Sequence, residues 1–374
     1  MNTGFAGKLG LIQRVLPAYR APFFGALAQA CGGGVYLAFG KPRPIESIQT
    51  TETVDGVNLF KTRNMHFLGG SFYFCFQKGL HPWLEKTQLD ALIIEANPRY
   101  LSSASAIRWM HAHHKPVIGW GLGAPGNKGP FNGLRDRFLK QFDTLIAYSQ
   151  KGADEYASMG FDSQAIFVAK NAVTAKPAHP MPTRPLDFPG KPVVLFVGRL
   201  QARKRLDNLI QACAQQPVDL QPELWVIGDG PARQELEALA HQFYPSTQFL
   251  GARFSEELID YFKKADLFVL PGTGGLAIQQ AMSFGLPVIV AGGDGTQNDL
   301  VRPRNGWQIP SDDLEALTKA LTIALSDPAR LRDMGAEGYR IVSDEINLEK
   351  MVDVFMQAVH YSLEKMMSQR NLSK

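Results

Sequence analysis

Residues 267–290 constrain the fold of this chain more than any other stretch. The run Leu267–Leu270 is short and apolar, which predicts a buried strand, and a glycine-rich loop at residues 272–275 follows it. Apolar residues at helical spacing then predict a helix over Leu276–Phe284, and the run Leu286–Val290 predicts a second buried strand. A strand, a helix and a second strand in this order form a βαβ unit, in which the two strands are parallel.

The loop of this unit has a chemical use. Because glycine carries no side chain, a ligand can approach the backbone of Gly272, Gly274 and Gly275, with Thr273 among them. The first backbone N–H groups of the helix that begins at Leu276 have no partners within the helix, so they can bind an anion such as a phosphate. The alternative is a tight turn whose glycines serve packing alone.

The same alternation of strands and helices extends over most of the chain. The exception is the segment 175–191, which carries five prolines and predicts a linker. Buried strands are predicted before it at Leu9–Val15, Gly34–Phe39, Asp90–Ala96, Pro116–Trp120, Asp143–Tyr148 and Ala165–Ala169, and after it at Val193–Val197, Glu223–Ile227 and Thr247–Leu250. The pattern therefore predicts an α/β fold with two doubly wound, Rossmann-like domains that face each other across a cleft.

The expected domain boundaries follow from this linker. Residues 1–174 are expected to form the first domain and residues 192–346 the second. Residues 347–374 carry most of a long terminal helix, which we expect to cross back to the first domain. Shorter helices are predicted elsewhere, among them Arg99–Ala112 and Pro328–Gly335.

Charge is distributed unevenly along the chain, although the net charge is only +4. Residues 1–184 contain 20 Lys and Arg against 11 Asp and Glu, and the remainder contains 19 against 24. A nucleic-acid-binding protein usually has no such acidic second half, so we expect no nucleic-acid partner. The basic first half suits anionic lipid headgroups or a phosphorylated acceptor, with ordinary surface solubility as the alternative.

The cysteines and the N-terminal sequence bear on the compartment. Cys31, Cys75 and Cys213 are few, odd in number and far apart, which matches neither a disulfide framework nor a zinc site and favours a reducing compartment. The first residues contain no apolar run long enough for a signal peptide, and no stretch is long enough to span a membrane. We therefore expect a cytoplasmic protein.

Two further stretches allow alternative interpretations. The segment Met65–Leu84 is dense in aromatic residues, so it is either a buried core segment, which we favour, or a partly exposed apolar patch that touches a membrane surface. His111, His113 and His114 are either metal ligands or a polar helix end; the second is favoured because adjacent helical residues do not face each other.

One motif carries a resemblance to a known family. The stretch VVLFVGRLQARKRLDNLIQA, residues 193–212, resembles the G-R-L-x-x-x-K motif of the retaining glycosyltransferases of family 4, which have the GT-B fold. In that family the arginine and the lysine hold the diphosphate of a nucleotide sugar. The resemblance assigns these roles to Arg199 and Lys204, with Gly198 allowing close approach of the donor.

Other stretches extend the resemblance over nearly the whole chain. VIGDGPARQELEALA resembles the family's turn near the nucleobase, which places Asp229 and Gly230 on the donor side. RVLPAYRAPFF resembles the N-terminal strand and helix of bacterial members that build surface polysaccharides, which places Arg14 and Arg20 on the acceptor side. Many members carry a histidine about where Leu122 stands, in a loop that is a candidate for substrate contact.

The donor loop departs from the family's pattern. The family has two glutamates separated by seven residues, and this chain has Gly272 and Gln280 at those positions. The Gln280 carbonyl oxygen can still accept a hydrogen bond from a ribose hydroxyl, and Thr273 is a partial substitute on the sugar side. These losses leave a catalytically silent sugar-nucleotide-binding subunit open as an alternative, and a sugar-nucleotide epimerase of the same fold as a further one.

The resemblance implies a glycosyltransferase that moves a sugar from a nucleotide donor to a glycan or lipid-linked glycan acceptor with retention of configuration. Catalysis would then consist of positioning and of charge stabilisation on the leaving diphosphate by Arg199, Lys204 and the helix amides at Gly275 and Leu276. The sequence has no Asp-x-Asp pair of the kind that metal-dependent transferases use, so we expect neither a metal nor a cofactor. Peripheral contact with the cytoplasmic face of the membrane is also expected.

Overall fold

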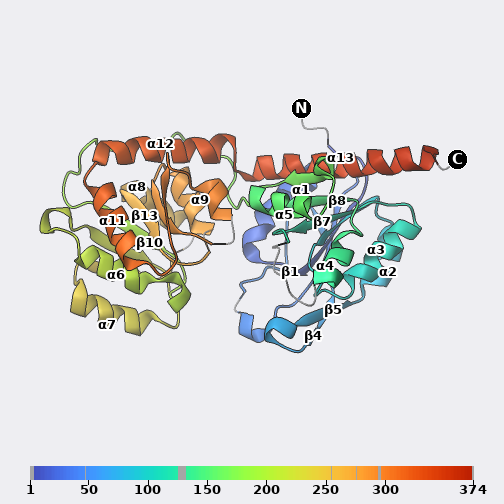
Figure 1. Ribbon diagram of the computed structural model, residues 1–374, viewed down its shortest axis with the longest axis horizontal. Helices are drawn as coiled ribbons and strands as arrows, with labels where there is room; N and C mark the ends of the chain where they lie inside the picture. The colour runs from blue at the N-terminus through green and yellow to red at the C-terminus, as the bar shows by residue number, and fades with distance from the viewer. Residues whose placement is uncertain are drawn as a thin grey trace. The chain divides into compact units, whose positions relative to one another are not determined.

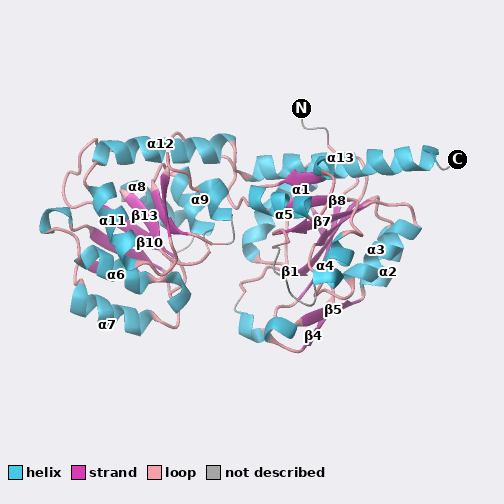
Figure 2. Ribbon diagram, viewed as in Figure 1, coloured by secondary structure: helices cyan, strands magenta, loops and turns pink. Residues whose placement is uncertain are grey.

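The computed structural model of this chain describes residues 4–46, 48–124, 132–253, 255–274, 276–293 and 296–372. The chain divides into two compact units (Figure 1). Unit 1 consists of Met1–Val173 together with Leu348–Lys374, and unit 2 consists of Thr174–Asn347. Figure 2 shows that helices cover both faces of the main sheet in each unit.

Unit 1 is built on a seven-stranded parallel sheet of order β3-β2-β1-β6-β7-β8-β9. Its strands are β1 (Leu9–Val15), β2 (Val35–Gly40), β3 (Val57–Lys61), β6 (Ala91–Glu95), β7 (Val117–Gly121), β8 (Thr144–Ala147) and β9 (Ile166–Val168). Its helices are α1 (Ala21–Gln29), α2 (Leu80–Thr87), α3 (Ser103–Ala112), α4 (Asn132–Leu139), α5 (Gln150–Ser158) and α13 (Leu348–Leu372). The central strands are runs of buried apolar residues because both faces of the sheet are covered.

Helix α13 completes the core of unit 1. The Phe355 ring lies 4.8 Å from the Phe23 ring and 5.0 Å from the Trp120 ring, and all three side chains are buried. Ser362 Oγ donates a hydrogen bond of 2.7 Å to Thr144 Oγ1 on β8. The last helix of the chain is therefore an integral part of the first unit.

A two-stranded antiparallel hairpin lies apart from the main sheet of unit 1 (Figure 1). It consists of β4 (Arg63–Phe67) and β5 (Phe74–Lys78). For the hairpin the preference for a buried core segment is wrong, because Met65, Phe67, Leu68, Phe72 and Phe76 are exposed. It is correct for the end of the segment, because Leu80, Trp83 and Leu84 on α2 are buried. Alternate side chains of a strand point to opposite faces, so burying one face of the hairpin leaves the aromatic residues of the other face in solvent.

Unit 2 is built on a six-stranded parallel sheet of order β12-β11-β10-β13-β14-β15. Its strands are β10 (Val193–Val197), β11 (Glu223–Ile227), β12 (Thr247–Phe249), β13 (Leu267–Leu270), β14 (Val288–Ala291) and β15 (Gly306–Ile309). Its helices are α6 (Leu206–Ala214), α7 (Arg233–Phe243), α8 (Ile259–Lys264), α9 (Leu276–Ser283), α10 (Thr296–Leu300), α11 (Leu314–Leu325) and α12 (Pro328–Asp344). In such a sheet the strand order reverses between β10 and β13, and ligands bind at that point beyond the carboxyl ends of the strands.

Two predicted helix boundaries are wrong. Helix α3 begins at Ser103 rather than Arg99, and α12 continues to Asp344 rather than ending at Gly335. Gly335 does not end the helix; it allows a close contact, because a Cβ there would clash with the Gly285 carbonyl oxygen. Gly285 itself has a φ of +67° after α9, as expected of a glycine that caps a helix.

The side chain of Gln279 joins the two places where the chain passes between units. Gln279 lies on α9 and is buried. Its Nε2 donates to the Ile346 carbonyl oxygen at 2.5 Å, and its Oε1 accepts from Thr174 N at 3.2 Å. Both ends of unit 2 are therefore held by the helix that follows the glycine-rich loop.

The proline-rich segment 175–191 belongs to unit 2 and is held on it by a half-buried arginine. Arg184 donates to the carbonyl oxygens of Phe262 at 2.8 Å, Phe284 at 2.9 Å and Ala265 at 3.0 Å. Burial, together with the nearby charge of Arg332, lowers the pKa of this guanidinium to about 10.

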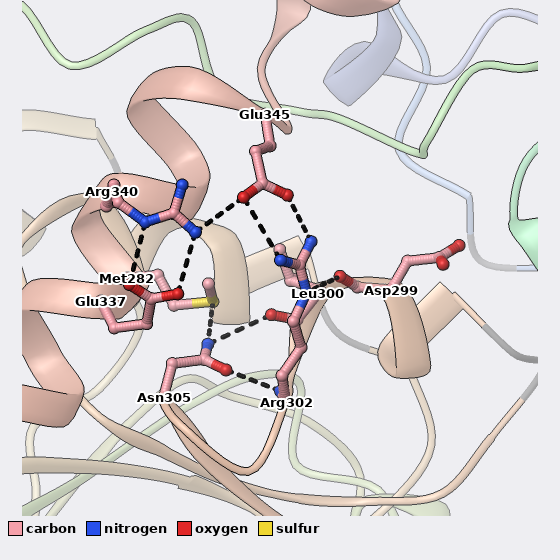
Figure 3. Close-up of polar contacts among 8 residues, drawn as sticks. All are labelled: Met282, Asp299, Leu300, Arg302, Asn305, Glu337, Arg340 and Glu345. Carbon is pink, nitrogen blue, oxygen red and sulfur yellow. Dashed lines mark hydrogen bonds and ion pairs between the residues drawn. The ribbon is translucent and has the colours of Figure 1, made fainter.

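An ion-pair cluster forms at the end of α12, just before the chain leaves unit 2 (Figure 3). Glu345 Oε2 lies 2.6 Å from Arg302 Nη2, and Glu345 Oε1 lies 2.7 Å from Arg340 Nη2. Asn305 Oδ1 accepts from Arg302 N at 2.6 Å, which fixes the backbone of the arginine. The hydrogen bond from Arg302, with that from Arg340, lowers the pKa of Glu345 to about 2.

Replacing Glu345 with glutamine is expected to lower the free energy of unfolding by about 1 kcal/mol at neutral pH, since the carboxylate is partly exposed. A depressed pKa stabilises the fold above the pKa of the unfolded state. The difference from wild type should therefore shrink as the pH falls from about 4.5, where Glu345 of the unfolded chain is protonated, to about 2, where Glu345 of the folded chain is protonated. Urea unfolding at several pH values measures this. Glu315→Gln, an exposed site on α11, is the control, and an unchanged difference at low pH would contradict the assignment.

Candidate functional site

Two loops at the carboxyl edge of the unit 2 sheet lie against each other. One follows β10 and the other follows β13, so together they flank the point where the strand order reverses. Thr273 N donates to the Arg203 carbonyl oxygen at 3.0 Å, and Lys204 Nζ donates to the Thr273 carbonyl oxygen at 2.7 Å. The Arg203 guanidinium also reaches Thr273 Oγ1 at 3.3 Å. Two cations therefore lie beside the glycine-rich loop that leads into α9.

The glycines of this loop are sterically required. A Cβ at Gly272 would clash with the Arg203 carbonyl oxygen and the Lys204 backbone. Gly274 has a φ of +87°, and a Cβ there would lie 2.9 Å from Lys204 Nζ. The basic loop thus fits the glycine-rich loop only because these two positions carry no side chain. Gly275 lies outside the described residues.

The Lys204 ammonium is partly withdrawn from water. Burial, together with the positive charge of Arg203, lowers the pKa of Lys204 to about 8. The group is therefore mostly protonated at pH 7, and an anion near it would be stabilised by a charge in a poorly solvated position. A backbone carbonyl is its hydrogen-bond partner in this structure.

The remaining predicted donor-side residues surround these loops. Arg199 is exposed, two residues after β10, and Leu276 is exposed as the first residue of α9. Gln280 lies one turn further along α9 and is half-buried. The predicted phosphate ligands Arg199 and Lys204 and the first turn of α9 therefore lie at one edge of the unit 2 sheet.

The turn after β11 packs on the loop after β10. Leu200 N donates to the Asp229 carbonyl oxygen at 3.0 Å, and a Cβ at Gly230 would clash with the Leu200 backbone. Gly198 has room for a Cβ, which would lie 3.5 Å from the Phe196 ring. The close contact between the two loops is instead made by Gly228, which has a φ of +147° and where a Cβ would clash with the Gly198 carbonyl oxygen. The Asp229 side chain accepts from Gly230 N at 2.7 Å and is exposed.

The predicted acceptor-side arginines of unit 1 lie in different surroundings. Arg14 Nη1 lies 2.8 Å from Glu46 Oε2, and Arg14 Nε donates to Tyr100 Oη at 3.3 Å. Burial alone would lower the pKa of Arg14, but the hydrogen bond with Glu46 and the neighbouring Tyr100 outweigh it and raise that pKa. Arg14 therefore stays charged at the carboxyl end of β1.

Arg20 is buried, and its guanidinium lies 5.0 Å from the Trp120 ring centre and 5.4 Å from the Tyr148 ring centre. Arg20 Nη1 is a buried donor with no hydrogen-bond partner among the described residues. Leu122 follows β7 and is exposed. Residues 125–130 of the same predicted substrate-contact loop lie outside the described residues.

Two residues near these sites were not predicted. Arg203 contacts the glycine-rich loop directly, and its only sequence signal is its place in the basic run Arg203-Lys204-Arg205. Glu95 ends β6 beside β1 and accepts from Arg14 N at 2.5 Å. Burial raises the pKa of the Glu95 carboxyl, with the Arg14 hydrogen bond opposing the shift. The sequence signal that could have identified Glu95 is a carboxylate at the end of a predicted buried strand.

Neither a metal cluster nor a membrane-spanning helix is found in the part of the chain that the structure describes. No group of three or more His, Cys, Asp or Glu among those residues is placed to hold a metal ion. No helix there has the length and hydropathy to cross a bilayer. As expected of a polar helix end, His111 at the end of α3 pairs with Asp143, with Nε2 3.0 Å from Oδ2.

A family model and a curated relative match this chain. The model described as "Glycosyl transferases group 1" matches residues 183–341. The chain is 29% identical over 269 residues to a GDP-mannose-dependent monoacylated alpha-(1-6)-phosphatidylinositol monomannoside mannosyltransferase of Corynebacterium glutamicum. That match covers 66% of this chain and 68% of the relative.

Solved structures share the fold. The apo form of the lipopolysaccharide outer core galactosyltransferase WaaB matches with a TM-score of 0.68 at 16% identity, over 95% of this chain and 99% of that one. Anabaena HepE in complex with UDP matches with a TM-score of 0.68 at 16% identity, over 95% of this chain and 100% of that one. Both matches include both units, so the likeness concerns the architecture of the whole chain.

Proposed function

Since this chain belongs to the group 1 glycosyltransferases and has the GT-B fold, we propose that the carboxyl edge of its unit 2 sheet binds the diphosphate of the donor. The protein is a nucleotide-sugar-dependent glycosyltransferase of glycan or cell-envelope biosynthesis.

The observation that carries the donor assignment is the position of Lys204. Its ammonium lies 2.7 Å from the Thr273 carbonyl oxygen, in a loop whose glycines leave the backbone open, one turn before α9. A diphosphate there would meet Lys204, the neighbouring Arg203 and the start of a helix, which together supply charge and N–H donors. Arg199 is the third cation that we assign to the diphosphate.

In the proposed reaction, the bond between the donor sugar and its diphosphate breaks, and negative charge develops on the leaving phosphate. Arg199 and Lys204 neutralise that charge and so stabilise the transition state. The acceptor hydroxyl attacks from the same face, which retains configuration, and its proton passes to the leaving phosphate as the new bond forms. We place the acceptor at unit 1 near Arg14, Arg20 and Leu122. Glu95 is a further candidate for holding an acceptor hydroxyl, because its carboxyl group lies at the end of β6, at the same edge of the unit 1 sheet as Arg14 at the end of β1.

The acceptor that we propose is a glycan or a lipid-linked glycan at the cytoplasmic face of the membrane. The name of the Corynebacterium relative includes a monoacylated phosphatidylinositol mannoside, and the structure of HepE contains UDP. A catalytically silent sugar-nucleotide-binding subunit remains the second candidate, because Gly272 and Gln280 stand where the family has glutamates.

A panel of nucleotide sugars tests both candidates by binding and by slow release of the nucleoside diphosphate. A transferase is expected to bind one donor and to release its nucleoside diphosphate, with more release when a cell-envelope lipid extract is added. Binding with no release under either condition would favour the silent subunit. Failure of every donor to bind would reject the diphosphate site itself.

The pKa of Lys204 predicts how donor affinity depends on pH. A lysine with a lowered pKa carries its charge below that value and loses it above, so the nucleoside diphosphate should bind best below pH 8. Between about pH 7 and pH 9.5 the Kd is expected to rise about tenfold, the value of one charged hydrogen bond. Calorimetry in buffers of equal ionic strength measures this. Lys204→Arg, which stays charged, should flatten the profile, and a flat wild-type profile would contradict the prediction.

A further inference from the structure

Arg205 follows Lys204 directly and has a backbone conformation that does not favour an arginine. It ends the 3₁₀ turn Ala202–Lys204 and precedes α6, and its φ is +54°. This left-handed conformation is costly for a residue with a side chain, whereas glycine adopts it freely. An arginine held in such a conformation points to a use for its side chain.

The Arg205 guanidinium is bound through all three of its nitrogen atoms. Nε donates to Asp207 Oδ1 at 3.2 Å, and Nη2 donates to Asp207 Oδ2 at 3.0 Å and to Asn208 Oδ1 at 2.9 Å. Nη1 forms an ion pair with Asp312 Oδ1. A planar guanidinium that binds several oxygens at once has a fixed orientation. Arg205 is therefore held by protein groups at the start of α6.

Asp312 brings a second loop into this contact. It lies after β15 and has a φ of +63°, so both residues of the ion pair have left-handed backbones. The helices that follow the two residues, α6 and α11, lie against each other, and Thr322 Oγ1 on α11 donates to Gln216 Oε1 at 2.8 Å. The ion pair therefore ties the loop after β15 to the loop after β10, where the two helices begin.

The backbone connects this contact to Lys204. Arg205 N donates to the Ala202 carbonyl oxygen at 3.0 Å, which closes the turn that carries the lysine. From this turn the Lys204 ammonium reaches the Thr273 carbonyl oxygen at 2.7 Å. Since the turn ends at Arg205, the conformation of Arg205 determines the direction in which the Lys204 side chain leaves the backbone.

We propose that Arg205 is a positioning residue for Lys204 and that Asp312 anchors Arg205 from the loop after β15. The bound guanidinium holds the left-handed turn in the conformation that places the Lys204 ammonium beside the glycine-rich loop. Displacing a group of this kind by about 1 Å can lower its effect by about a hundredfold. This inference rests on the proposed function, because it assigns a role to Arg205 within the same donor site.

Replacing Arg205 with glycine separates the side chain from the turn. Glycine fits a φ of +54° better than arginine does, so a merely structural turn residue predicts donor affinity that is unchanged or higher. The positioning role predicts instead that the Kd for UDP or GDP rises about tenfold or more, measured by calorimetric titration of the full chain at pH 7. Gln88→Gly, at an exposed residue of unit 1 with a φ of +51°, is the matched control and should leave the Kd unchanged.

The pH dependence of nucleoside diphosphate binding shows whether Arg205 acts through Lys204. The wild type is expected to lose affinity about tenfold between about pH 7 and pH 9.5, as Lys204 loses its charge. In Arg205→Gly this loss should be about twofold or less, because a displaced ammonium no longer meets the diphosphate. For the same reason, adding Lys204→Ala to Arg205→Gly should weaken binding by about twofold or less.

Two substitutions at Asp312 test the anchor without changing Arg205, and they decide the proposal if Arg205→Gly does not fold. Asp312→Gly suits a φ of +63° but removes the carboxylate, so the Kd should rise about threefold or more. Asp312→Asn keeps an oxygen that accepts from Arg205 and tolerates the same backbone conformation, so it should retain most of the affinity. An unchanged Kd in Asp312→Gly would contradict the anchor. Thermal melting shows whether each variant is folded.

Equal affinity of Arg205→Gly and the wild type would overturn the proposal. Weaker binding by Arg205→Gly with the full pH dependence retained would also overturn it, since Arg205 would then act on the diphosphate without Lys204. Both results leave the proposed function intact, because both include donor binding by the wild type. Failure of the wild type to bind either nucleoside diphosphate would reject the donor site itself, and this inference with it.

Discussion

Replacing Lys204 with alanine is expected to lower kcat/KM for the nucleotide-sugar donor by about a hundredfold to a thousandfold, the usual effect of losing one group that stabilises charge in the transition state. The ammonium lies beside the glycine-rich loop and is partly shielded from water, so solvent cannot replace it fully. Steady-state release of the nucleoside diphosphate measures the change. Arg199→Ala is expected to act in the same direction, and the double variant should bind donor weakly.

The control for this experiment is Lys319→Ala, which removes an exposed lysine of α11 in the same unit. It should leave both kcat and KM unchanged. If Lys204→Ala raised KM but left kcat unchanged, Lys204 would bind the donor equally well in the ground state and the transition state. That result would contradict its proposed role in stabilising the leaving group.

Replacing Gly272 with glutamate is expected to abolish donor binding rather than to improve catalysis, although the family has glutamate at this position. Any side chain at residue 272 clashes with the Arg203 carbonyl oxygen and the Lys204 backbone, so the basic loop must move away. Since the loop carries Lys204, we expect a loss of about a hundredfold or more in donor affinity. Calorimetric titration with the nucleoside diphosphate measures this.

Gly190→Ala is the matched control for the substitution, because a Cβ at Gly190 meets no atom within 4 Å. Gly272→Ala separates size from charge and should already lose most of the affinity. A gain in turnover by Gly272→Glu would show that the loop has room for the side chain and that this chain lacks only the carboxylate. The silent-subunit alternative would then gain support for the wild type.

The parts of unit 2 that could be predicted from sequence are those in which one local pattern determines the structure. Strands β10, β11 and β13 begin and end at the predicted residues, because apolar residues make up all or most of each strand. Strand β15 was not predicted, because Trp307 and Gln308 interrupt any apolar run. This segment is a strand because it pairs with β14, and that pairing is not visible in the local sequence.

The candidate site was predictable only as far as the motif reaches. Arg199 and Lys204 follow from their spacing, but which cation of Arg203-Lys204-Arg205 faces Thr273 depends on the fold of the loop. The reason for glycine at residue 272 is likewise a contact between residues about 70 positions apart, which no local pattern contains. The exposed face of β4–β5 was misjudged because aromatic density alone does not distinguish a core from an open surface.

The division of the chain into units also has a consequence for the order in which the protein is made. Unit 2 is one continuous segment, Thr174–Asn347, inserted between the two pieces of unit 1. A ribosome completes every strand of the unit 1 sheet long before it synthesises α13, whose Phe355 covers Phe23 and Trp120. The inserted unit can fold during this interval, whereas the first unit waits with an uncovered apolar face, the state in which nascent chains are most prone to aggregate and most in need of a chaperone.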